Sequence, residues 1–312
     1  MRILFFGSPQ FAVPTLQALV ASSHAVVGVV TQPDRPRGRG QRVTPGAVAA
    51  AAQALGLPLF QPAKLSVPGV AEALAAFRAD LGVVAAYGKI LPDWLLALPP
   101  AGMVNVHASL LPAYRGAAPV HRAVIEGARE SGVTIMRVVS ALDAGPIIDR
   151  AVVPIGPDET SAELERALGQ VGAPLLVAVV DRLSVGAVVE TPQDERAATY
   201  AAKITRADSA VAWTRSARAI HDQIRGLHPW PHAATKMAGQ RVILHRSVRI
   251  EGAGAGPPGH VLASSVAGID VVAGDGAVVR LTELQAEGGR RLPAADYLAG
   301  HPLPAGATFD AL

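Results

Sequence analysis

One stretch decides how the first part of this chain folds: Val104-Asn105-Val106-His107-Ala108-Ser109-Leu110-Leu111-Pro112. Apolar Val104 and Val106 alternate with Asn105 and His107, and this spacing predicts a β-strand with the amide and the imidazole on one face. Pro112 follows closely and ends the regular structure. We therefore expect the pair near the carboxyl end of a strand, which is the edge where open α/β sheets bind ligands.

Around this stretch, short apolar runs alternate with helical patterns. The predicted strands are Ile3–Phe6, Val26–Val30, Leu81–Ala85, Met103–Val106 and Val133–Val139, with Asp149–Ile155 as an edge strand. The predicted helices are Phe11–Val20, Pro45–Leu55, Val70–Phe77 and Pro119–Ile125, followed by one that a Thr160/Glu163 capping box opens and that runs to about Leu183. Such alternation predicts an α/β fold with a doubly wound, mainly parallel, Rossmann-like sheet.

The pattern changes after a polar, aperiodic segment at residues 191–206. A helix at Arg215–Arg225 precedes short β-rich runs at Arg241–His245, His260–Leu262, Ile269–Val272 and Ala277–Leu284, with a Gly274-Asp275-Gly276 hairpin signal. Short strands at this spacing predict a small, OB-like β-barrel. We therefore expect a first domain at 1–190, a linker at 191–206 and a barrel domain at 207–312.

Composition narrows the class of protein. The 312 residues include no cysteine, which excludes disulfides, thiolate nucleophiles and cysteine-ligated zinc. The net charge is only +3, and almost all of the positive charge is arginine. No run approaches the roughly 18 uncharged apolar residues of a membrane span, and the N-terminus enters a strand directly, without an export signature. We expect a cytoplasmic protein that has no membrane partner.

A later loop residue completes a candidate active site. Asp143, in Leu142-Asp143-Ala144-Gly145-Pro146, follows the Val133–Val139 strand, and we expect neighbouring carboxyl-end loops to bring it to His107 directly or through one water. Asn105 can donate an oriented N–H to a developing oxyanion. The imidazole and the carboxylate can together take the proton of an amine. This set of residue types suits acyl transfer to an amine.

Other chemistries lack their motifs. The chain has no Gly-x-Ser-x-Gly elbow, no Walker lysine loop and no His-Glu-x-x-His. His228 and His232 are the nearest approach to a metal pair, but two prolines separate them, so we expect no metal. Gly7-Ser8-Pro9 follows the first strand without the glycines of a dinucleotide fingerprint, which favours a turn in a pocket wall over a nicotinamide site.

A basic segment offers a surface for a polyanion. Four arginines, Arg35, Arg37, Arg39 and Arg42, lie in a Gly/Pro-rich run that we expect to be a mobile loop, neither helix nor strand. Mobile guanidinium groups suit a phosphate backbone, although composition alone also fits an ordinary solvated loop.

Together these motifs resemble the methionyl-tRNA formyltransferase family over essentially the whole chain. The residues that carry the resemblance are Gly7–Pro9, Thr31–Pro36, Ala86–Pro92, Asn105–Pro112, Arg115–Pro119, Leu142–Pro146 and Pro229–Pro231. The Asn-x-His and Leu-Asp-x-Gly motifs are shared by folate-dependent formyltransferases, so they indicate the reaction class but not the acceptor. The basic segment and the C-terminal barrel favour the tRNA enzyme.

The resemblance implies specific roles. A formyl group would pass from 10-formyltetrahydrofolate, without a metal, to the α-amine of methionine on initiator tRNA, in a monomeric enzyme. Asn105, His107 and Asp143 would be catalytic, and Ser109, Leu110, Leu111 and Pro112 would bind the folate, with Ile90 and Leu91 at the pterin pocket. Arg35, Arg37, Arg39 and Arg42 would contact the acceptor stem.

Departures from the family pattern are modest, and two alternatives stay open. Ala113 stands where arginine is frequent, Ala141 where glycine is common, Gln41-Arg42 at a usually lysine-rich loop end, and His228 where asparagine is usual. These changes leave the catalytic trio intact. A formyltransferase acting on a sugar-nucleotide amine would have the same trio, and an RNA-binding module with a vestigial catalytic domain would not need it.

Overall fold

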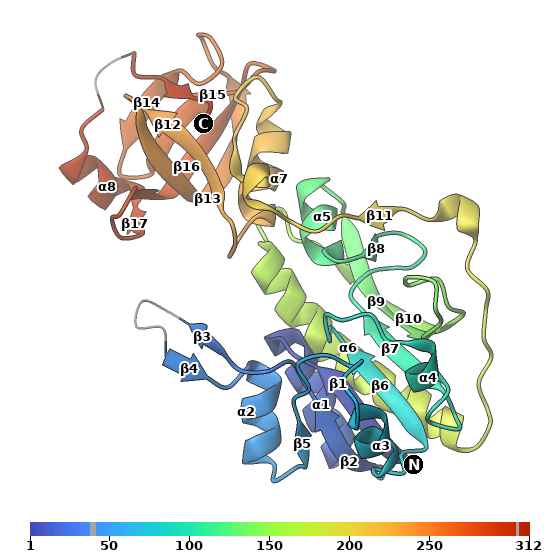
Figure 1. Ribbon diagram of the computed structural model, residues 1–312. Helices are drawn as coiled ribbons and strands as arrows, with labels where there is room; N and C mark the ends of the chain where they lie inside the picture. The colour runs from blue at the N-terminus through green and yellow to red at the C-terminus, as the bar shows by residue number, and fades with distance from the viewer. Residues whose placement is uncertain (38–41, 304–305) are drawn as a thin grey trace. The chain divides into compact units, whose positions relative to one another are not determined.

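The computed structural model describes residues 1–37, 42–303 and 306–312 (Figure 1). Two compact units emerge. The first comprises Met1–Pro119, Glu130–Pro154 and Glu165–Ala201, and the second comprises Val120–Arg129, Ile155–Leu164 and Ala202–Leu312. Two short segments of the second unit are therefore embedded in the sequence of the first.

The first unit is built on a seven-stranded sheet in the order β10-β9-β7-β6-β1-β2-β5. Its strands are β1 (Arg2–Gly7), β2 (Ala25–Val30), β5 (Leu59–Phe60), β6 (Leu81–Ala85), β7 (Met103–His107), β9 (Glu130–Arg137) and β10 (Ile147–Pro154). The pairs from β7 to β5 are parallel, whereas β9 pairs antiparallel with β7 and β10 with β9. The predicted mainly parallel sheet is confirmed, as is the β10 edge strand.

Helices cover both faces of this sheet (Figure 1). They are α1 (Val13–Ala21), α2 (Ala47–Ala54), α3 (Val70–Ala75), α4 (Asp93–Leu96) and α6 (Ser161–Ser184). Helix α5 (Pro119–Ile125) belongs almost entirely to the second unit. On one face Met103 belongs to a buried cluster with Leu74 of α3 and Leu95 of α4. On the other face α6 packs so closely that a Cβ on Gly172 would lie 3.1 Å from Val106 Cγ1. The alternation along β7 thus separates two cores.

Helix α6 begins at the predicted capping box. The Thr160 N–H donates to Glu163 Oε2 at 2.8 Å, and the Glu163 N–H donates to Thr160 Oγ1 at 3.3 Å. Each bond satisfies a donor that the first turn leaves without an intrahelical acceptor. Among the described helices, α6 alone is long and apolar enough to cross a membrane, but core helices pass this test too, and 39% of its most apolar window is buried inside the protein.

The second unit contains an antiparallel sheet in the order β14-β15-β16-β13-β12-β18, with β17 beside β16. The strands are β12 (Ala233–Met237), β13 (Gln240–Ala253), β14 (Val261–Ser265), β15 (Gly268–Val272), β16 (Ala277–Ala286), β17 (Leu292–Pro293) and β18 (Phe309–Asp310), with helices α7 (Ala217–Gly226) and α8 (Ala294–Gly300). The sheet curls until its ends approach, since the Phe309 N–H donates to Gly259 O at 2.8 Å and the Val261 N–H donates to Ala307 O at 2.9 Å. This half-barrel agrees with the predicted β-barrel class, including the β15–β16 hairpin.

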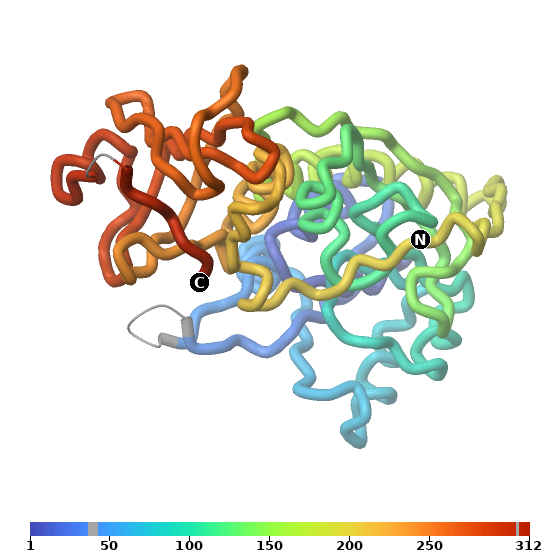
Figure 2. Tube along the Cα trace, turned by 90° about the horizontal axis from the view of Figure 1, so that it is seen from above, coloured from blue at the N-terminus to red at the C-terminus, as the bar shows by residue number. Residues whose placement is uncertain are grey.

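Short elements complete the fold. The ribbon of β3 (Arg35–Arg37) and β4 (Arg42–Thr44) projects from the body of the first unit in both views (Figures 1 and 2). A parallel pair of β8 (Arg115–Gly116) and β11 (Tyr200–Ala201) joins the segment after β7 to the end of the predicted linker. Single 3-10 turns lie at Gln10–Ala12, Glu195–Ala197 and Arg206–Ser209.

Candidate active site

Asn105 and His107 lie on the predicted strand, β7, and project from the same face of the sheet as Met103. Val104 and Val106 are buried on the opposite face. Within the described parts of the chain the Asn105 side-chain amide has no hydrogen-bond partner, although it is only partly exposed. An oriented donor without a protein partner is available to a substrate oxygen.

The His107 ring is buried, with 6% of its surface exposed, and its two nitrogens have different neighbours. Nε2 lies 3.1 Å from the Tyr114 carbonyl oxygen. Because a carbonyl can only accept, Nε2 carries the hydrogen in the neutral ring and Nδ1 carries the lone pair. Nδ1 faces Asp143 Oδ1 at 3.7 Å. Nδ1 is therefore the nitrogen that can take a proton.

Asp143 reaches the histidine by a route that differs from the expected one. Because β9 is antiparallel to β7, its carboxyl end at Arg137 pairs with Val104, at the start of β7. The expected convergence of two carboxyl-end loops is therefore wrong in detail. Instead, the nine-residue connection from β9 to β10 brings Asp143 to His107. The Gly116 N–H fixes its carboxylate by donating to Oδ2 at 2.8 Å, which leaves Oδ1 facing the imidazole.

Three residues that sequence reasoning missed hold this loop. The Gln193 amide donates from Nε2 to the carbonyls of Asp143 and Gly145, both at 2.8 Å. Its Oε1 accepts from Arg115 Nη2 at 2.8 Å, and Arg115 also donates to Glu195 Oε1 at 2.8 Å. Arg115 is 1% exposed, and its hydrogen bond to Glu195 lowers the pKa of that carboxyl. The predicted linker thus contributes Gln193 and Glu195 to the support of Asp143.

The segment expected to bind folate forms a tight turn after β7. Ser109 is buried and its hydroxyl donates to Ala113 O at 2.7 Å, while Thr134 Oγ1 donates to Ser109 O at 2.7 Å. Leu111 is fully buried and a cis peptide bond joins it to Pro112. Leu110 and Pro112 keep partial exposure. The turn therefore offers contact surface mainly through these two residues. Ile90, which follows the carboxyl end of β6 in the sequence, is 88% exposed.

A cavity of about 330 Å³ opens at the carboxyl ends of β1, β2 and β6. Its lining residues are Ser8, Pro9, Thr31, Gln32, Pro33, Arg35, Gly46 and Ala86. The strand order reverses at β1, where doubly wound sheets bind ligands. The predicted role of the Gly7-Ser8-Pro9 turn in a pocket wall is thus confirmed for Ser8 and Pro9. Asn105, which pairs with Val84 of β6, is not among the lining residues.

We predicted that the basic segment is a mobile loop, neither helix nor strand. This prediction is wrong for the two ends of the segment. β3 and β4 pair antiparallel in the register Arg35–Thr44, Pro36–Val43 and Arg37–Arg42. Pro36 is tolerated because a two-stranded ribbon leaves one side of each strand without ladder partners. Arg35 is exposed. Arg39 and the side chains of Arg37 and Arg42 lie outside the described residues, so their predicted contacts stay a prediction.

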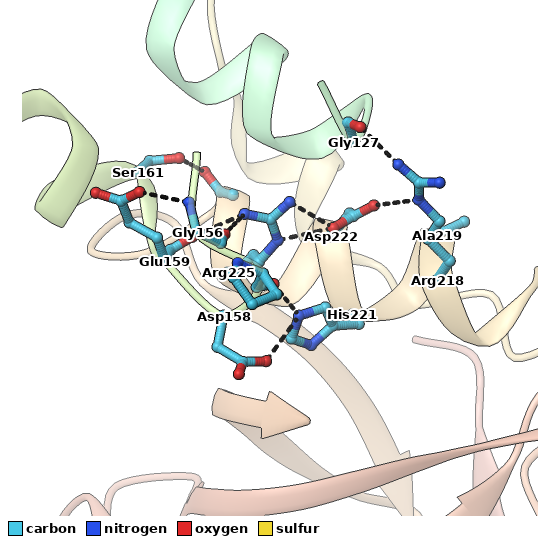
Figure 3. Close-up of polar contacts among 12 residues, drawn as sticks. Gly127, Gly156, Asp158, Glu159, Ser161, Arg218, Ala219, His221, Asp222 and Arg225 are labelled. Atoms are coloured by element: carbon cyan, nitrogen blue, oxygen red, sulfur yellow. Dashed lines mark hydrogen bonds and ion pairs between the residues drawn. The ribbon is translucent and has the colours of Figure 1, made fainter. Parts of the chain in front are cut away.

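A second basic site, not predicted from the sequence, lies within the second unit (Figure 3). A cavity of about 270 Å³ is lined by Gly127, Ala128, Arg129, Ile155, Gly156, Pro157, Arg218, His221, Asp222, Arg225 and Arg249. Asp222 neutralises Arg225, at 2.7 Å, and faces Arg218 at 3.5 Å. Arg129 and Arg249 are exposed and have no described partner. The spacing of these arginines over three chain segments explains why the sequence pattern did not reveal the site.

The chain is similar to known proteins over nearly its whole length. Residues 1–180 match the family model described as formyl transferase, and residues 203–302 match that of the formyl transferase C-terminal domain. The methionyl-tRNA formyltransferase of Trichlorobacter lovleyi is 45% identical over 98% of this chain and 96% of its own length. That of Thiobacillus denitrificans is 45% identical over all of both chains.

Solved structures share the fold at low sequence identity. An N-formyltransferase from Helicobacter canadensis, in complex with folinic acid and dTDP-3-aminofucose, has a TM-score of 0.69 at 16% identity, covering 90% of this chain and 98% of its own. HypX from Aquifex aeolicus, in complex with tetrahydrofolic acid, has a TM-score of 0.67 at 20% identity, covering 98% of this chain and 48% of its own. These likenesses establish the architecture alone.

Proposed function

The chain belongs to the formyl transferase family, and we propose on that basis that it formylates the α-amine of methionyl-tRNA. The observation that carries this function is the 45% identity to methionyl-tRNA formyltransferases across the full chain. Initiator tRNA is the proposed acceptor and 10-formyltetrahydrofolate the proposed donor. The folate supplies the formyl carbon, and no other group is required for the transfer.

We assign the chemistry to three side chains. The Asn105 amide donates to the carbonyl oxygen as negative charge develops there during attack by the amine. His107, with its hydrogen on Nε2, accepts the proton of the amine at Nδ1. Asp143 then stabilises the imidazolium through its facing Oδ1. A C–N bond forms at the amine, the bond from the formyl carbon to the folate nitrogen breaks, and the proton leaves through His107 to the departing nitrogen.

Substrate positions follow from the arrangement of the first unit. We propose that Ser109, Leu110, Leu111 and Pro112 form the folate side, with Leu110 and Pro112 providing contact surface and the buried pair fixing the turn. The cavity at Ser8, Gln32 and Arg35 is the proposed place of the aminoacyl end, since it lies at the ligand-binding edge and holds an exposed guanidinium.

Binding of the tRNA backbone is assigned to two basic regions. We propose that Arg35, Arg37, Arg39 and Arg42 contact the acceptor stem, and that Arg129 and Arg249 of the second-unit cavity contact further phosphates. The guanidinium groups of Arg129 and Arg249 have no carboxylate partner among the described residues, which leaves them free for bidentate phosphate contacts. In this assignment residues 1–190 carry catalysis and part of the RNA contacts, 191–206 form the connection, and 207–312 add further RNA contacts, in a monomeric cytoplasmic enzyme.

A sugar-nucleotide amine is the alternative acceptor, because the trio suits any amine. One assay separates the two: transfer of labelled formyl from 10-formyltetrahydrofolate to methionyl-tRNA or to a nucleotide-linked amino sugar. We expect label on the tRNA, and comparison of initiator with elongator methionyl-tRNA measures discrimination between them. Label on the sugar alone would refute the tRNA assignment, and label on neither would refute the enzyme.

A further inference from the structure

Three imidazoles gather in the second unit, and none of them belongs to the trio assigned to the chemistry. His228 and His232 belong to the connection between α7 and β12, and His245 belongs to β13. One candidate ligand nitrogen from each ring lies within 4.8 Å of the other two. The ring centroids of His232 and His245 are 4.3 Å apart, and that of His228 is 5.2 Å from His232. The rings are tilted at 55° to 75° rather than stacked, so their nitrogens can converge.

Each of these rings has a buried nitrogen without a partner. The Nδ1 atoms of His228, His232 and His245 are all shielded from solvent, and none has a hydrogen bond within the described residues. A buried polar atom without a partner is costly, and such atoms are rare in native proteins. Three of them in one cluster of rings indicate that something outside the chain satisfies them.

The proton of His245 is fixed by its surroundings. Gln285 donates from Nε2 to Gly289 O at 2.9 Å, which sets the orientation of its amide. Its Oε1 therefore faces His245 Nε2 at 2.9 Å and must accept a hydrogen from it. The free Nδ1 of His245 consequently carries a lone pair. A histidine that donates from one nitrogen to an amide oxygen and offers the other is the usual arrangement of a metal ligand.

Burial of the cluster favours the neutral form of the three rings. Burial is the largest cause that lowers the pKa of all three histidines, and it brings the pKa of His232 to about 4. Neutral imidazole is the form that binds a metal ion. Carboxylates reduce the repulsion between the neighbouring guanidinium groups and a bound cation, because Arg246 pairs with Glu163 and Arg291 with Glu283.

We propose that His228, His232 and His245 bind one divalent transition-metal ion of the zinc class, through three imidazole nitrogens and with a fourth position open to water. Imidazole ligands without carboxylates favour zinc, copper or nickel over magnesium or calcium. A tetrahedral site with Zn–N bonds of about 2.0 Å needs nitrogens about 3.3 Å apart. Small rotations of the half-buried His228 and His232 rings would close the remaining distance.

The test is titration of the full, tag-free chain with Zn²⁺ alone, after removal of bound metal by a chelator. We expect one equivalent to bind, with nitrogen neighbours at about 2.0 Å by X-ray absorption. His232→Gln and His228→Asn should each weaken binding at least tenfold. His260→Gln, which alters a partly exposed histidine of the same unit, should not.

Outcomes are separable from those of the proposed function, because Zn²⁺ binding does not require substrate. Absence of a saturable equivalent would overturn the site, as would His228→Asn protein that folds normally and binds Zn²⁺ as tightly as the parent. Circular dichroism verifies that each variant folds, and both variants change half-buried histidines rather than the more buried His245. A rise in Tm with Zn²⁺ in the parent, but not in the two variants, would support the site independently.

Discussion

Nδ1 of His107 faces Oδ1 of Asp143 at 3.7 Å, a separation too long for a direct hydrogen bond. The other ring nitrogen is engaged with the Tyr114 carbonyl, and the other carboxylate oxygen accepts from the Gly116 N–H. One polar atom of each side chain is thus fixed by the backbone, and the other two atoms, Nδ1 and Oδ1, face each other. A proton accepted by Nδ1 would lie between the ring and the carboxylate.

Asn105→Ala should lower kcat by about 10² to 10³, the usual effect of losing one oxyanion donor. The affinity for tRNA should be unchanged, because the strand and the basic regions are unaffected. Single-turnover formylation and a separate filter-binding titration measure the two quantities. Near-normal turnover would remove Asn105 from the chemistry.

Asp143→Asn should retain the loop, because the amide oxygen can still accept from the Gly116 N–H, but it loses the negative charge beside His107. We expect kcat to fall by about 10² or more with little change in KM for either substrate. Asp143→Ala, which removes both interactions, is the comparison. Equal and small losses in the two variants would show that the charge has no part in the reaction.

Gly116→Ala should destabilise the first unit. Gly116 has φ +117°, and a Cβ there would lie 2.9 Å from Ala201 O. Strain at such a position costs about 1–3 kcal/mol. Gly186→Ala is the matched control, since Gly186 has φ +70° with no atom within 4 Å of an added Cβ. Urea unfolding should give the larger loss for Gly116→Ala, and a loss no greater than the control would contradict the close approach.

Glu163 gives the second unit a pH-dependent interaction. Its hydrogen bond with Arg246 lowers its pKa to about 2, while the unfolded chain keeps the ordinary value near 4.5. A depressed folded pKa adds stability that is complete above 4.5 and is lost as pH falls toward 2. The free energy of unfolding of the parent should exceed that of Glu163→Gln at pH 6, and the difference should shrink between pH 4.5 and 2. A constant difference would show that the charge is not responsible.

Removing Arg129 and Arg249 together should weaken tRNA binding and reduce the dependence of log Kd on log salt by about two phosphate contacts. The double replacement of Arg37 and Arg39 tests the β3–β4 segment in the same way. Arg166→Gln, an exposed arginine of α6, controls for net charge. An unchanged salt slope in either double variant would show that those arginines are merely solvated.

Local periodicity predicted much of this protein. The alternation of Val104 to His107 gave β7 and the common face of Asn105 and His107. Thr160 and Glu163 predicted the start of α6 because the capping box depends on residues three apart. The residue patterns alone predicted only a reaction class, acyl transfer to an amine. The resemblance was needed to identify the family.

What the sequence did not predict depends on distant contacts. Hydrophobic runs carry no information on strand direction, so β9 was expected to be parallel, although it is antiparallel to β7. Gln193 supports Asp143 from 50 residues away, in a segment without periodicity. The third histidine of the cluster, His245, lies on β13, and nothing in the sequence pattern of that strand links it to His228 and His232. The β3–β4 ribbon forms in a composition rich in turn residues, where pairing outweighs propensity.

Residues 120–129 and 155–164 belong to the second unit although both their neighbours in sequence belong to the first. Ile125 lies against Gly226, and the Ser161 hydroxyl donates to Gly226 O at 2.7 Å. A gene fragment ending near residue 201 would therefore encode these two segments without their packing partners. Exchange of the second unit between related enzymes by a single crossover would leave mismatched surfaces, so a chimaera that keeps all three of its segments together should require five crossovers.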